Sequence, residues 1–353
     1  MARVPKPVVF EEDEDLPVRA NPDLIGHEHA AATLEAAARS GRLPHAWLLA
    51  GPPGIGKATL AYRFARWLLA GGAGRPATPG APPLHLPPEN AVFRRVAAGS
   101  HADMFVLRPE AGTGVKALIK IDEVRTVINR LALTPGEGGW RVVLVDGAET
   151  MRGESANALL KTLEEPPPRA VLLLTTPAPD RLLPTIRSRC RRLDLAPLDL
   201  AETQAVLARQ RPEMPAADRA RLAAIAEGSP GQALSLAEGE GLALQELVDA
   251  VLAGLAGGDR RRWHTVADQV AAKRDGSAFV TFMALLRREI SGAVRRAARG
   301  DAAAPGWLAI RPLAEWSTLW DSLGRLAAET DVLSLDRKQA VLTALGWLSP
   351  PRR

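Results

Sequence analysis

The sequence predicts an α/β fold with a parallel sheet, followed by an all-helical region. Two observations support this: short apolar runs alternate with helical patterns up to Pro197, and beyond it the strand-like runs stop. The apolar runs are continuous rather than alternating, as in strands that helices cover on both faces. With 353 residues, 46% hydrophobic and 24% charged, the chain is long enough for two or three domains.

Five runs are predicted as strands, and three stretches between them as helices. The predicted strands are 45–50, 104–107, 141–146, 170–176 and 192–195. The predicted helices are 59–70, 121–131 and 155–163. This alternation indicates a doubly wound sheet. Residues 71–90 are rich in glycine and proline, so we expect a loop there.

Beyond the last predicted strand the pattern is helical. Short helices are predicted at 198–209 and 218–227, followed by a Gly-Ser-Pro-Gly break at 228–231. Apolar residues then recur at helical spacing through 244–255 and again through 313–323. These apolar stripes need partners, either one another or a neighbouring subunit.

Composition excludes several classes of protein. A single cysteine excludes a disulfide scaffold and a cysteine-rich zinc module. No apolar run reaches the roughly 18 residues of a membrane span, and the first residues lack a signal-peptide pattern, so we expect a cytoplasmic protein. Residues 11–15 are consecutive acids, and we expect residues 1–19 to form a flexible acidic head.

The net charge of +5 is unevenly distributed. Residues 258–300 contain ten basic residues against four acidic ones. This cluster indicates either a helical face near nucleic-acid phosphates or an ordinary solvated surface, and both interpretations stay open. Aromatic residues do not interleave with these arginines, which argues against sequence-specific reading of single strands by stacking.

The strongest local motif is Gly51-Pro-Pro-Gly54-Ile-Gly56-Lys57. It follows an apolar run and precedes a helical pattern, which is the context of a phosphate-binding loop. Its glycines allow backbone amides to surround phosphate oxygens, and Lys57 is placed to reach the outer phosphates. A loop that keeps this shape without its ligand is the alternative.

Magnesium binding at this loop is in doubt. The residue after the lysine is normally Ser or Thr, whose hydroxyl binds Mg²⁺, but here it is Ala58. Thr59 comes one residue late and is turned about 100° away on a helix. Asp146 ends an apolar run and is predicted either to hold the water shell of magnesium or to cap the strand.

Several stretches carry a resemblance to a known family. They are Arg42–Trp47, His101–Met104, Ala156–Pro168, Leu183–Cys190 and Gly228–Leu234. With NALLKTLEEPP and TIRSRC among them, the chain resembles the clamp-loader branch of the AAA+ ATPases, and in particular the delta-prime subunits of bacterial DNA polymerase III. The resemblance covers roughly residues 20–240.

This resemblance implies a P-loop AAA+ parallel-sheet domain, a small helical lid and an all-α collar. The implied ranges are 1–19 for the head, 20–196 for the AAA+ nucleotide-binding-like domain, 197–245 for the lid and 246–353 for the collar. In this family the collar holds a hetero-oligomeric ring together. We therefore expect residues 246–353 to serve in oligomerisation.

The resemblance also assigns roles to single residues. Ser188-Arg189-Cys190 matches a motif whose arginine reaches the nucleotide site of the neighbouring subunit, so Arg189 is expected to act in trans as an arginine finger. A guanidinium suits this role because it stays charged and forks onto phosphate oxygens. Cys190 is interpreted as a packing residue. Thr175 and Thr176 lie where the family has its sensor 1 residue.

Departures from the family pattern point to a site without hydrolysis. Active members place a glutamate directly after the strand-end aspartate to polarise the attacking water, whereas this chain has Gly147, with Glu149 two residues further on. Gly231 stands where active loaders carry the sensor 2 arginine. Together with Ala58, these losses leave mainly nucleotide binding.

The prediction is a non-hydrolysing, delta-prime-like subunit of the DNA polymerase III clamp loader, a nucleotidyltransferase complex. The candidate nucleotide-site residues are Gly51, Gly54, Gly56, Lys57, Thr59, Asp146 and Thr176. No cofactor is expected to be required, and whether ATP or ADP binds stays open. No zinc is expected, because residues 71–100 lack the four cysteines of many relatives, and the histidines show no metal-ligand spacing.

The expected partners are a motor subunit and a delta-like wrench subunit, with primed DNA and the sliding clamp reached through the complex. The alternative function is an active AAA+ ATPase, either the motor subunit of the loader or a helicase motor. A small-molecule P-loop kinase would not explain TIRSRC or the helical C-terminal third.

Overall fold

The computed structural model describes residues 18–76, 79–112, 115–255, 260–273, 275–301 and 304–349, with the side chains of 110–117, 260 and 261 left out. The chain divides into two compact units. The first comprises residues 1–111 and 117–232, and the second comprises 112–116 and 233–353. Residues 1–17 of the predicted acidic head lie outside the described residues, whereas 18 and 19 belong to the 3-10 helix η1 (Val18–Ala20). The predicted domain boundaries stay predictions.

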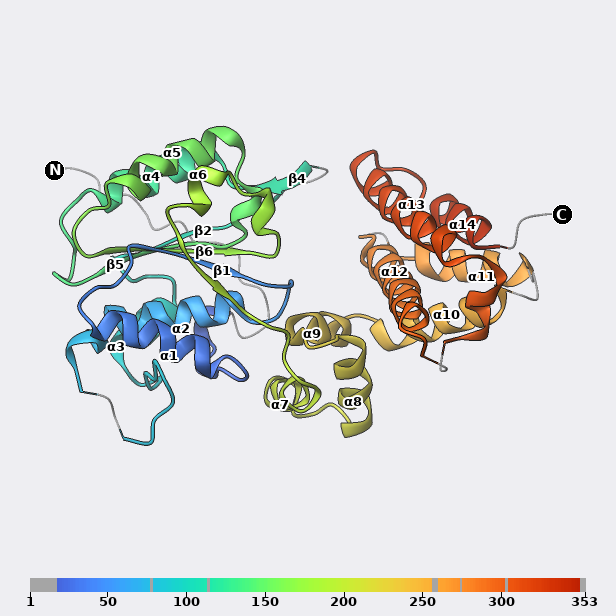
Figure 1. Ribbon diagram of the computed structural model, residues 1–353, viewed down its shortest axis with the longest axis horizontal. Coiled ribbons are helices and arrows are strands. Elements are labelled where there is room, and N and C mark those ends of the chain that lie inside the picture. Colours follow the sequence, from blue (N-terminus) through green and yellow to red (C-terminus); the bar gives the residue numbers. More distant parts are fainter. Residues whose placement is uncertain are drawn as a thin grey trace. The chain divides into compact units, whose positions relative to one another are not determined.

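The first unit contains a parallel five-stranded sheet with the strand order β2-β5-β6-β1-β7 (Figure 1). The strands are β1 (Ala46–Ala50), β2 (Met104–Leu107), β5 (Arg141–Val145), β6 (Ala170–Thr176) and β7 (Arg191–Asp194). Each lies within one residue of its predicted bounds. A separate two-stranded sheet, β3 (Glu110–Gly112) with β4 (Val115–Leu118), was not predicted.

Helices cover both faces of the sheet (Figure 1). One face carries α1 (Glu28–Arg39), α2 (Lys57–Leu69) and α3 (Ala91–Ala97), and the other carries α4 (Ile121–Leu131), α5 (Gly153–Glu164) and α6 (Pro184–Arg187). Along β1, Trp47 and Leu49 join one buried cluster while Ala46 and Leu48 join the other. The predicted doubly wound α/β fold is confirmed, and its two-sided burial explains the continuous apolar runs.

The proline-rich stretch after α2 is mainly loop, as predicted, and polar contacts hold its described part to the neighbouring helices. The guanidinium of Arg63 in α2 donates to the carbonyl of Pro83 at 3.0 Å. Leu84 is buried beneath the loop, and its amide donates to Glu35 of α1 at 2.8 Å. Charged side chains thus satisfy backbone groups that no secondary structure pairs.

After the sheet come α7 (Leu200–Gln210), α8 (Ala216–Ile225) and α9 (Pro230–Glu238). The predicted break at 228–231 is too long, because α9 already begins at Pro230. Proline fits the first turn of a helix, where its missing N–H would have no intrahelical partner.

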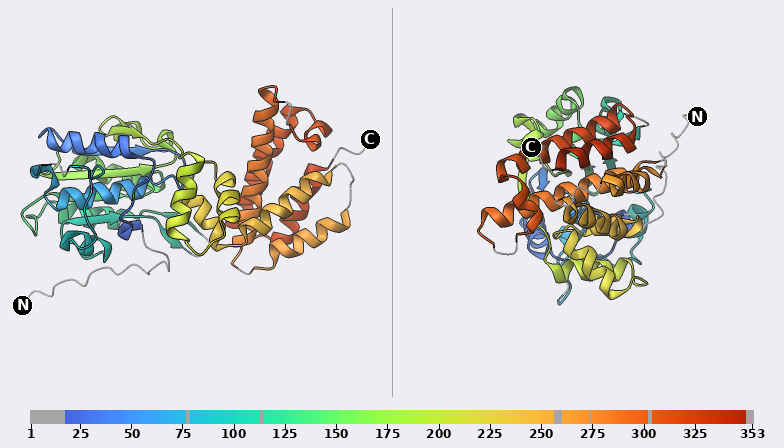
Figure 2. Two further views of the ribbon diagram at one scale, coloured as in Figure 1. Left: turned by 90° about the horizontal axis from the view of Figure 1, so that it is seen from below. Right: turned by 90° about the vertical axis from the view of Figure 1, so that its right-hand side faces the viewer.

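Beyond α9, the described part of the second unit contains five longer helices that contact one another (Figure 2). They are α10 (Gly241–Ala253), α11 (Arg260–Ala271), α12 (Ser277–Ala298), α13 (Leu313–Val332) and α14 (Arg337–Leu348). Trp316 and Leu323 of the predicted stripe are fully buried, whereas Leu313 is 37% exposed. No helix in the described part of the chain is long and apolar enough to cross a membrane.

Two of the clustered arginines of α12 have structural contacts within the second unit. Arg288 donates to Gln245 of α10 at 2.7 Å, and Arg287 donates to the carbonyl of Trp320 while stacking over its ring. This part of the basic cluster is therefore occupied by packing between helices.

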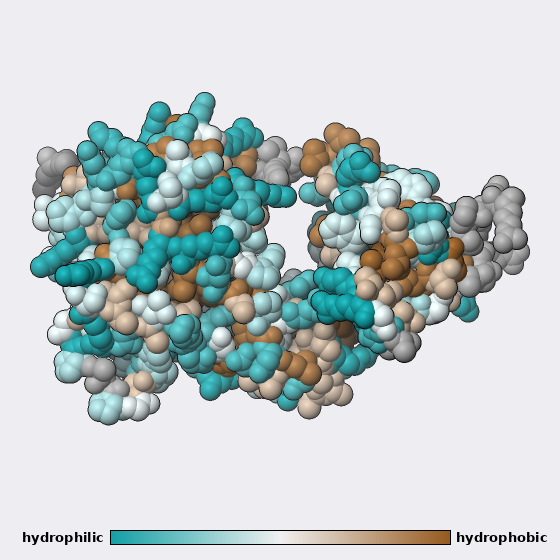
Figure 3. All heavy atoms as spheres, viewed as in Figure 1, coloured by the Kyte–Doolittle hydropathy of each residue, from teal (hydrophilic) through white to brown (hydrophobic). Residues whose placement is uncertain are grey.

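Exposed apolar side chains lie at the turn between α13 and α14, where Val332 and Leu333 are 60% and 64% exposed (Figure 3).

Candidate functional site

The predicted phosphate-binding loop connects the end of β1 to the start of α2. Gly54 and Gly56 adopt left-handed backbone conformations, with φ of 75° and 105°, which side chains with a Cβ rarely tolerate. Lys57 is the first residue of α2 and is only 8% exposed. The loop therefore has the strand–loop–helix setting that the motif predicts.

The lysine of this loop is turned back onto the loop itself. Its Nζ donates to the carbonyl of Gly51 at 2.8 Å and to that of Pro52 at 2.6 Å. Burial lowers the pKa of Lys57 below its usual value, while the carboxylates of Asp146 and Glu149 oppose that shift. A bound phosphate would compete with these two carbonyls for the ammonium group.

The next three carbonyls of the loop also have donors. The hydroxyl of Ser229 donates to Pro53 at 2.9 Å, and the amide of Gly231 donates to Gly54 at 2.8 Å. Nε2 of His27 lies 2.6 Å from the carbonyl oxygen of Ile55. Contacts from within the first unit therefore hold the shape of the loop.

Gly231, predicted to replace the sensor 2 arginine, lies directly against this loop. A Cβ at this position would stand 3.0 Å from both Cα and O of Gly54. Such contacts are tighter than ordinary van der Waals packing, and the neighbouring atoms are backbone that cannot swing away. A larger residue at 231 would require the start of α9 to move away from the loop.

The acidic side of the site lies at the carboxyl ends of β5 and β6. The hydroxyl of Thr175 donates to Asp146 at 2.6 Å and accepts from the amide of Gly147 at 3.0 Å. Thr176 is fully buried, and its hydroxyl accepts from the amide of Ala178 instead. Thr175 is therefore the threonine that contacts Asp146, whereas the sequence predicts Thr176 as the site residue.

Three further residues complete the site. Ala58 and Thr59 occupy the first turn of α2, directly after Lys57, so the motif position has no hydroxyl. Glu149 lies in the 3-10 turn after β5, and its Oε2 is buried without a hydrogen-bond partner within the described structure. Sequence reasoning gave Glu149 no role, although its distance from Asp146 along the chain was visible.

Arg189 is held at an exposed corner, here called the arginine corner and defined as residues 184–190. Its Nη1 donates to the carbonyl of Thr185 in α6 at 2.9 Å, and its Nη2 donates to Glu164 at the end of α5 at 2.6 Å. The Arg189 side chain is 33% exposed. It therefore lies at the domain edge, where another polypeptide can reach it.

Cys190, the next residue, packs against the cluster on the α4–α5–α6 side of the sheet. Burial raises the pKa of its thiol to about 12. The thiol is therefore protonated at neutral pH and unreactive.

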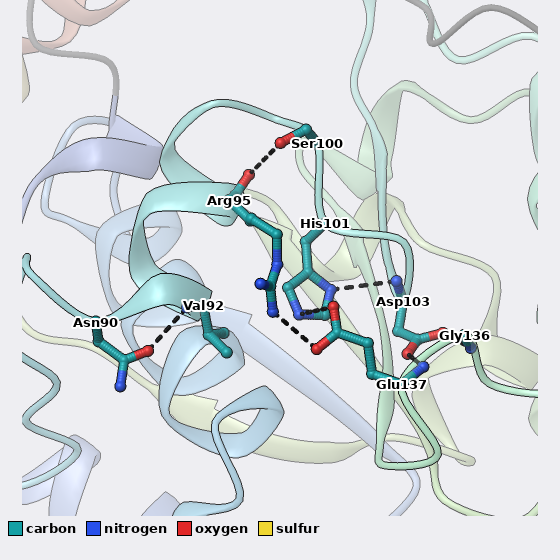
Figure 4. A network of polar contacts seen from close by, with 8 residues as sticks. All are labelled: Asn90, Val92, Arg95, Ser100, His101, Asp103, Gly136 and Glu137. Atoms are coloured by element: carbon teal, nitrogen blue, oxygen red, sulfur yellow. Dashed lines mark hydrogen bonds and ion pairs between the residues drawn. The ribbon is translucent and has the colours of Figure 1, made fainter.

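The stretch His101–Met104, part of the resemblance, forms a structural network (Figure 4). The carboxylate of Asp103, 3% exposed, accepts from the amides of Gly136 and Glu137 at 2.7 and 2.9 Å. Nδ1 of His101 accepts from the amide of Asp103, and Arg95 pairs with Glu137 at 2.8 Å. These contacts fasten the loop between α4 and β5 to the start of β2. Within the described residues, no three His, Cys, Asp or Glu side chains are grouped as metal ligands would be.

Comparison with known proteins agrees with this architecture. Residues 26–199 match the family model described as DNA polymerase III, delta subunit. The chain is 43% identical over 186 residues to DNA polymerase III subunit delta' of Pseudomonas aeruginosa, and this alignment covers 53% of each chain. It is 37% identical over 223 residues to the delta' subunit of Escherichia coli, covering 62% of each chain.

A similar protein with a different name is DNA polymerase III subunit tau of Escherichia coli. It is 33% identical over 242 residues, which cover 66% of this chain and 36% of tau. The aligned part of the chain thus spans between half and two thirds of the length of the delta' relatives, and a smaller share of tau. The resemblance to delta-prime subunits, read from the motifs, is confirmed over the matched region. Over residues 26–199, the chain is therefore similar to the DNA polymerase III delta-subunit family.

Proposed function

We propose that this chain is a delta-prime-like subunit of the DNA polymerase III clamp loader that supplies Arg189 to a neighbouring ATPase subunit and does not itself hydrolyse ATP. It acts beside a motor subunit and a delta-like wrench subunit in a ring, with the helices α10–α14 as the oligomerising collar. It meets primed DNA and the sliding clamp through that complex. The match of residues 26–199 to the family model of the DNA polymerase III delta subunit supports this role.

The observation that carries the proposal is the contrast between a degenerate site and an exposed arginine. The chain's own loop lacks the magnesium hydroxyl at Ala58 and the glutamate at position 147, and Gly231 leaves no room for an arginine beside Gly54. Arg189, by contrast, is partly exposed and held by neighbouring groups. It can stabilise the charge that builds on a phosphate leaving in the adjacent subunit.

No cofactor is needed for this role, and ATP or ADP bound at Gly51–Lys57 would serve structure rather than catalysis. We propose that the chain also needs no zinc, because the loop after α2 is held by contacts such as those of Arg63 and Glu35. Equilibrium binding of labelled ATP to the isolated chain measures whether nucleotide binds. Metal analysis of the purified protein measures whether zinc is present.

The test of the main proposal is DNA-stimulated ATP hydrolysis and clamp loading by the reconstituted complex. Arg189→Ala should leave assembly intact and reduce both rates at least about tenfold, below the 10³–10⁵ seen for GTPases because several sites share the work. Arg189→Lys should rescue little, since an ammonium cannot fork onto two oxygens. Unchanged rates in a fully assembled Arg189→Ala complex would overturn the trans role.

A second candidate, an active ATPase, is favoured by one observation. The charge of the Glu149 carboxylate acts to raise the pKa of Lys57. One of its oxygens, Oε2, has no hydrogen-bond partner in the described structure. In this candidate Glu149 replaces the missing glutamate as general base. Turnover by the isolated chain that Glu149→Gln and Lys57→Ala both abolish would establish it, and the absence of turnover would exclude it.

A further inference from the structure

Arg189 is joined to Glu164 by the shortest hydrogen bond in the arginine corner. Nη2 of Arg189 lies 2.6 Å from Oε1 of Glu164, within the range of a charge-assisted hydrogen bond. The two side chains are 33% and 49% exposed, so the pair stands at the surface. A pair in this setting contributes little to folding stability, because water screens both charges.

The guanidinium has two close acceptors, which come from different elements, and a third, the hydroxyl of Ser188, at 3.5 Å from Nη1. Thr185 is the second residue of α6 and offers its carbonyl, while Glu164 is the last residue of α5. One contact alone would leave the long arginine side chain free to rotate about its remaining torsions. The two close contacts, one from Nη1 and one from Nη2, fix the plane of the guanidinium.

The position of Glu164 is itself unfavourable for a carboxylate. Negative charge at the C-terminus of a helix is opposed by the helix dipole. Glu165, the next residue, adds a second negative charge at the same helix end. Pairing with Arg189 offsets that repulsion, so the ion pair also has a purely structural reason. An experiment has to distinguish this structural role from a role in catalysis.

We propose that Glu164 is a positioning residue for Arg189: together with the carbonyl of Thr185, its carboxylate holds the guanidinium in the orientation that meets a phosphate bound by the neighbouring subunit. The inference rests on the trans role proposed above. A carboxylate beside the guanidinium also lowers its positive potential, so Glu164 does not strengthen binding of the nucleotide. It acts on the rate of the chemical step through orientation.

The experiment measures kcat and KM for ATP in the reconstituted, DNA-stimulated complex with Glu164→Gln, alone and combined with Arg189→Ala. Glu164→Gln should lower kcat roughly two- to fivefold, as loss of an exposed pair implies, and should leave KM unchanged or lower. In the Arg189→Ala background it should change nothing, because Glu164 acts only through that arginine. Glu164→Asp, which is one methylene shorter, should recover part of kcat.

Two matched controls are available in the same region. Glu165→Gln makes the same change at the next residue along the chain, whereas the hydrogen bond of Arg189 goes to Glu164. Asp180→Asn breaks the 2.8 Å ion pair of Arg187, the other arginine of the corner. Both should leave kcat within error of the unmodified complex.

The outcomes separate the two proposals. If Arg189→Ala lowers kcat but Glu164→Gln does not, or lowers it equally in both backgrounds, the positioning role is wrong and the trans role stands. If Glu164→Gln only reduces the yield or thermal stability of the complex, the ion pair is structural and the positioning role is again wrong. If Arg189→Ala has no effect, both proposals are wrong.

Discussion

The phosphate loop and the arginine corner, both in the first unit, differ in how far their cationic side chains are buried. Lys57 is 8% exposed and donates to two carbonyls of its own loop. The Arg189 side chain is 33% exposed, and its guanidinium donates to Thr185 and Glu164. Both cations have acceptors within the chain, but only the arginine keeps part of its side chain at the surface, where a partner can reach it.

The largest expected effect is on the alkylation rate of Cys190, which reports how rigid the arginine corner is. With its pKa raised from 9.0 to about 12, the Cys190 thiol has a roughly thousandfold smaller thiolate fraction at pH 8. Alkylation of the native chain should therefore be about 10² to 10³ times slower than in urea. Mass spectrometry of iodoacetamide labelling checks this, with Cys190→Ser as the unlabelled control. Labelling at the unfolded rate would mean that the corner opens readily.

A smaller effect, on the free energy of unfolding, is expected for a substitution where α9 contacts the phosphate loop. Gly231→Arg forces a Cβ to within 3.0 Å of the Gly54 backbone, so we expect a loss of about 1–3 kcal/mol in the free energy of unfolding. Urea titration measures it. Gly153→Ala, where a Cβ meets nothing within 4 Å, should change the stability by less than about 1 kcal/mol. Equal midpoints for both variants would contradict the tight approach at Gly231.

The smallest effect is expected at the lysine of the phosphate loop. Lys57→Ala should change DNA-stimulated hydrolysis by the assembled complex less than about twofold, because in the proposed function the chain's own site contributes no turnover. Complex yield by gel filtration serves as the control for folding. A loss as large as that of Arg189→Ala would erase the contrast between the two regions and would favour the active-ATPase candidate.

Much of the first unit could be predicted from local pattern. Fully buried strands such as β1 and β6 are short continuous apolar runs, and their bounds follow directly from that signal. The phosphate loop and the TIRSRC motif are contiguous in sequence, so their presence needed no tertiary information. The helix α1 and the small sheet of β3 and β4 were missed, since alanine-rich and short polar segments carry a weak periodic signal.

The sequence by itself determined the doubly wound sheet, the phosphate loop and the missing groups at positions 58, 147 and 231, because each depends on residues close together in the chain. Only the tertiary structure decided which partners the site residues have. Thr175 rather than Thr176 meets Asp146, Ser229 and Gly231 reach the phosphate loop, and Glu164 holds Arg189. These contacts join residues up to 177 positions apart, as between Gly54 and Gly231, and no local pattern encodes such a meeting. Strand order and helix packing bring them together.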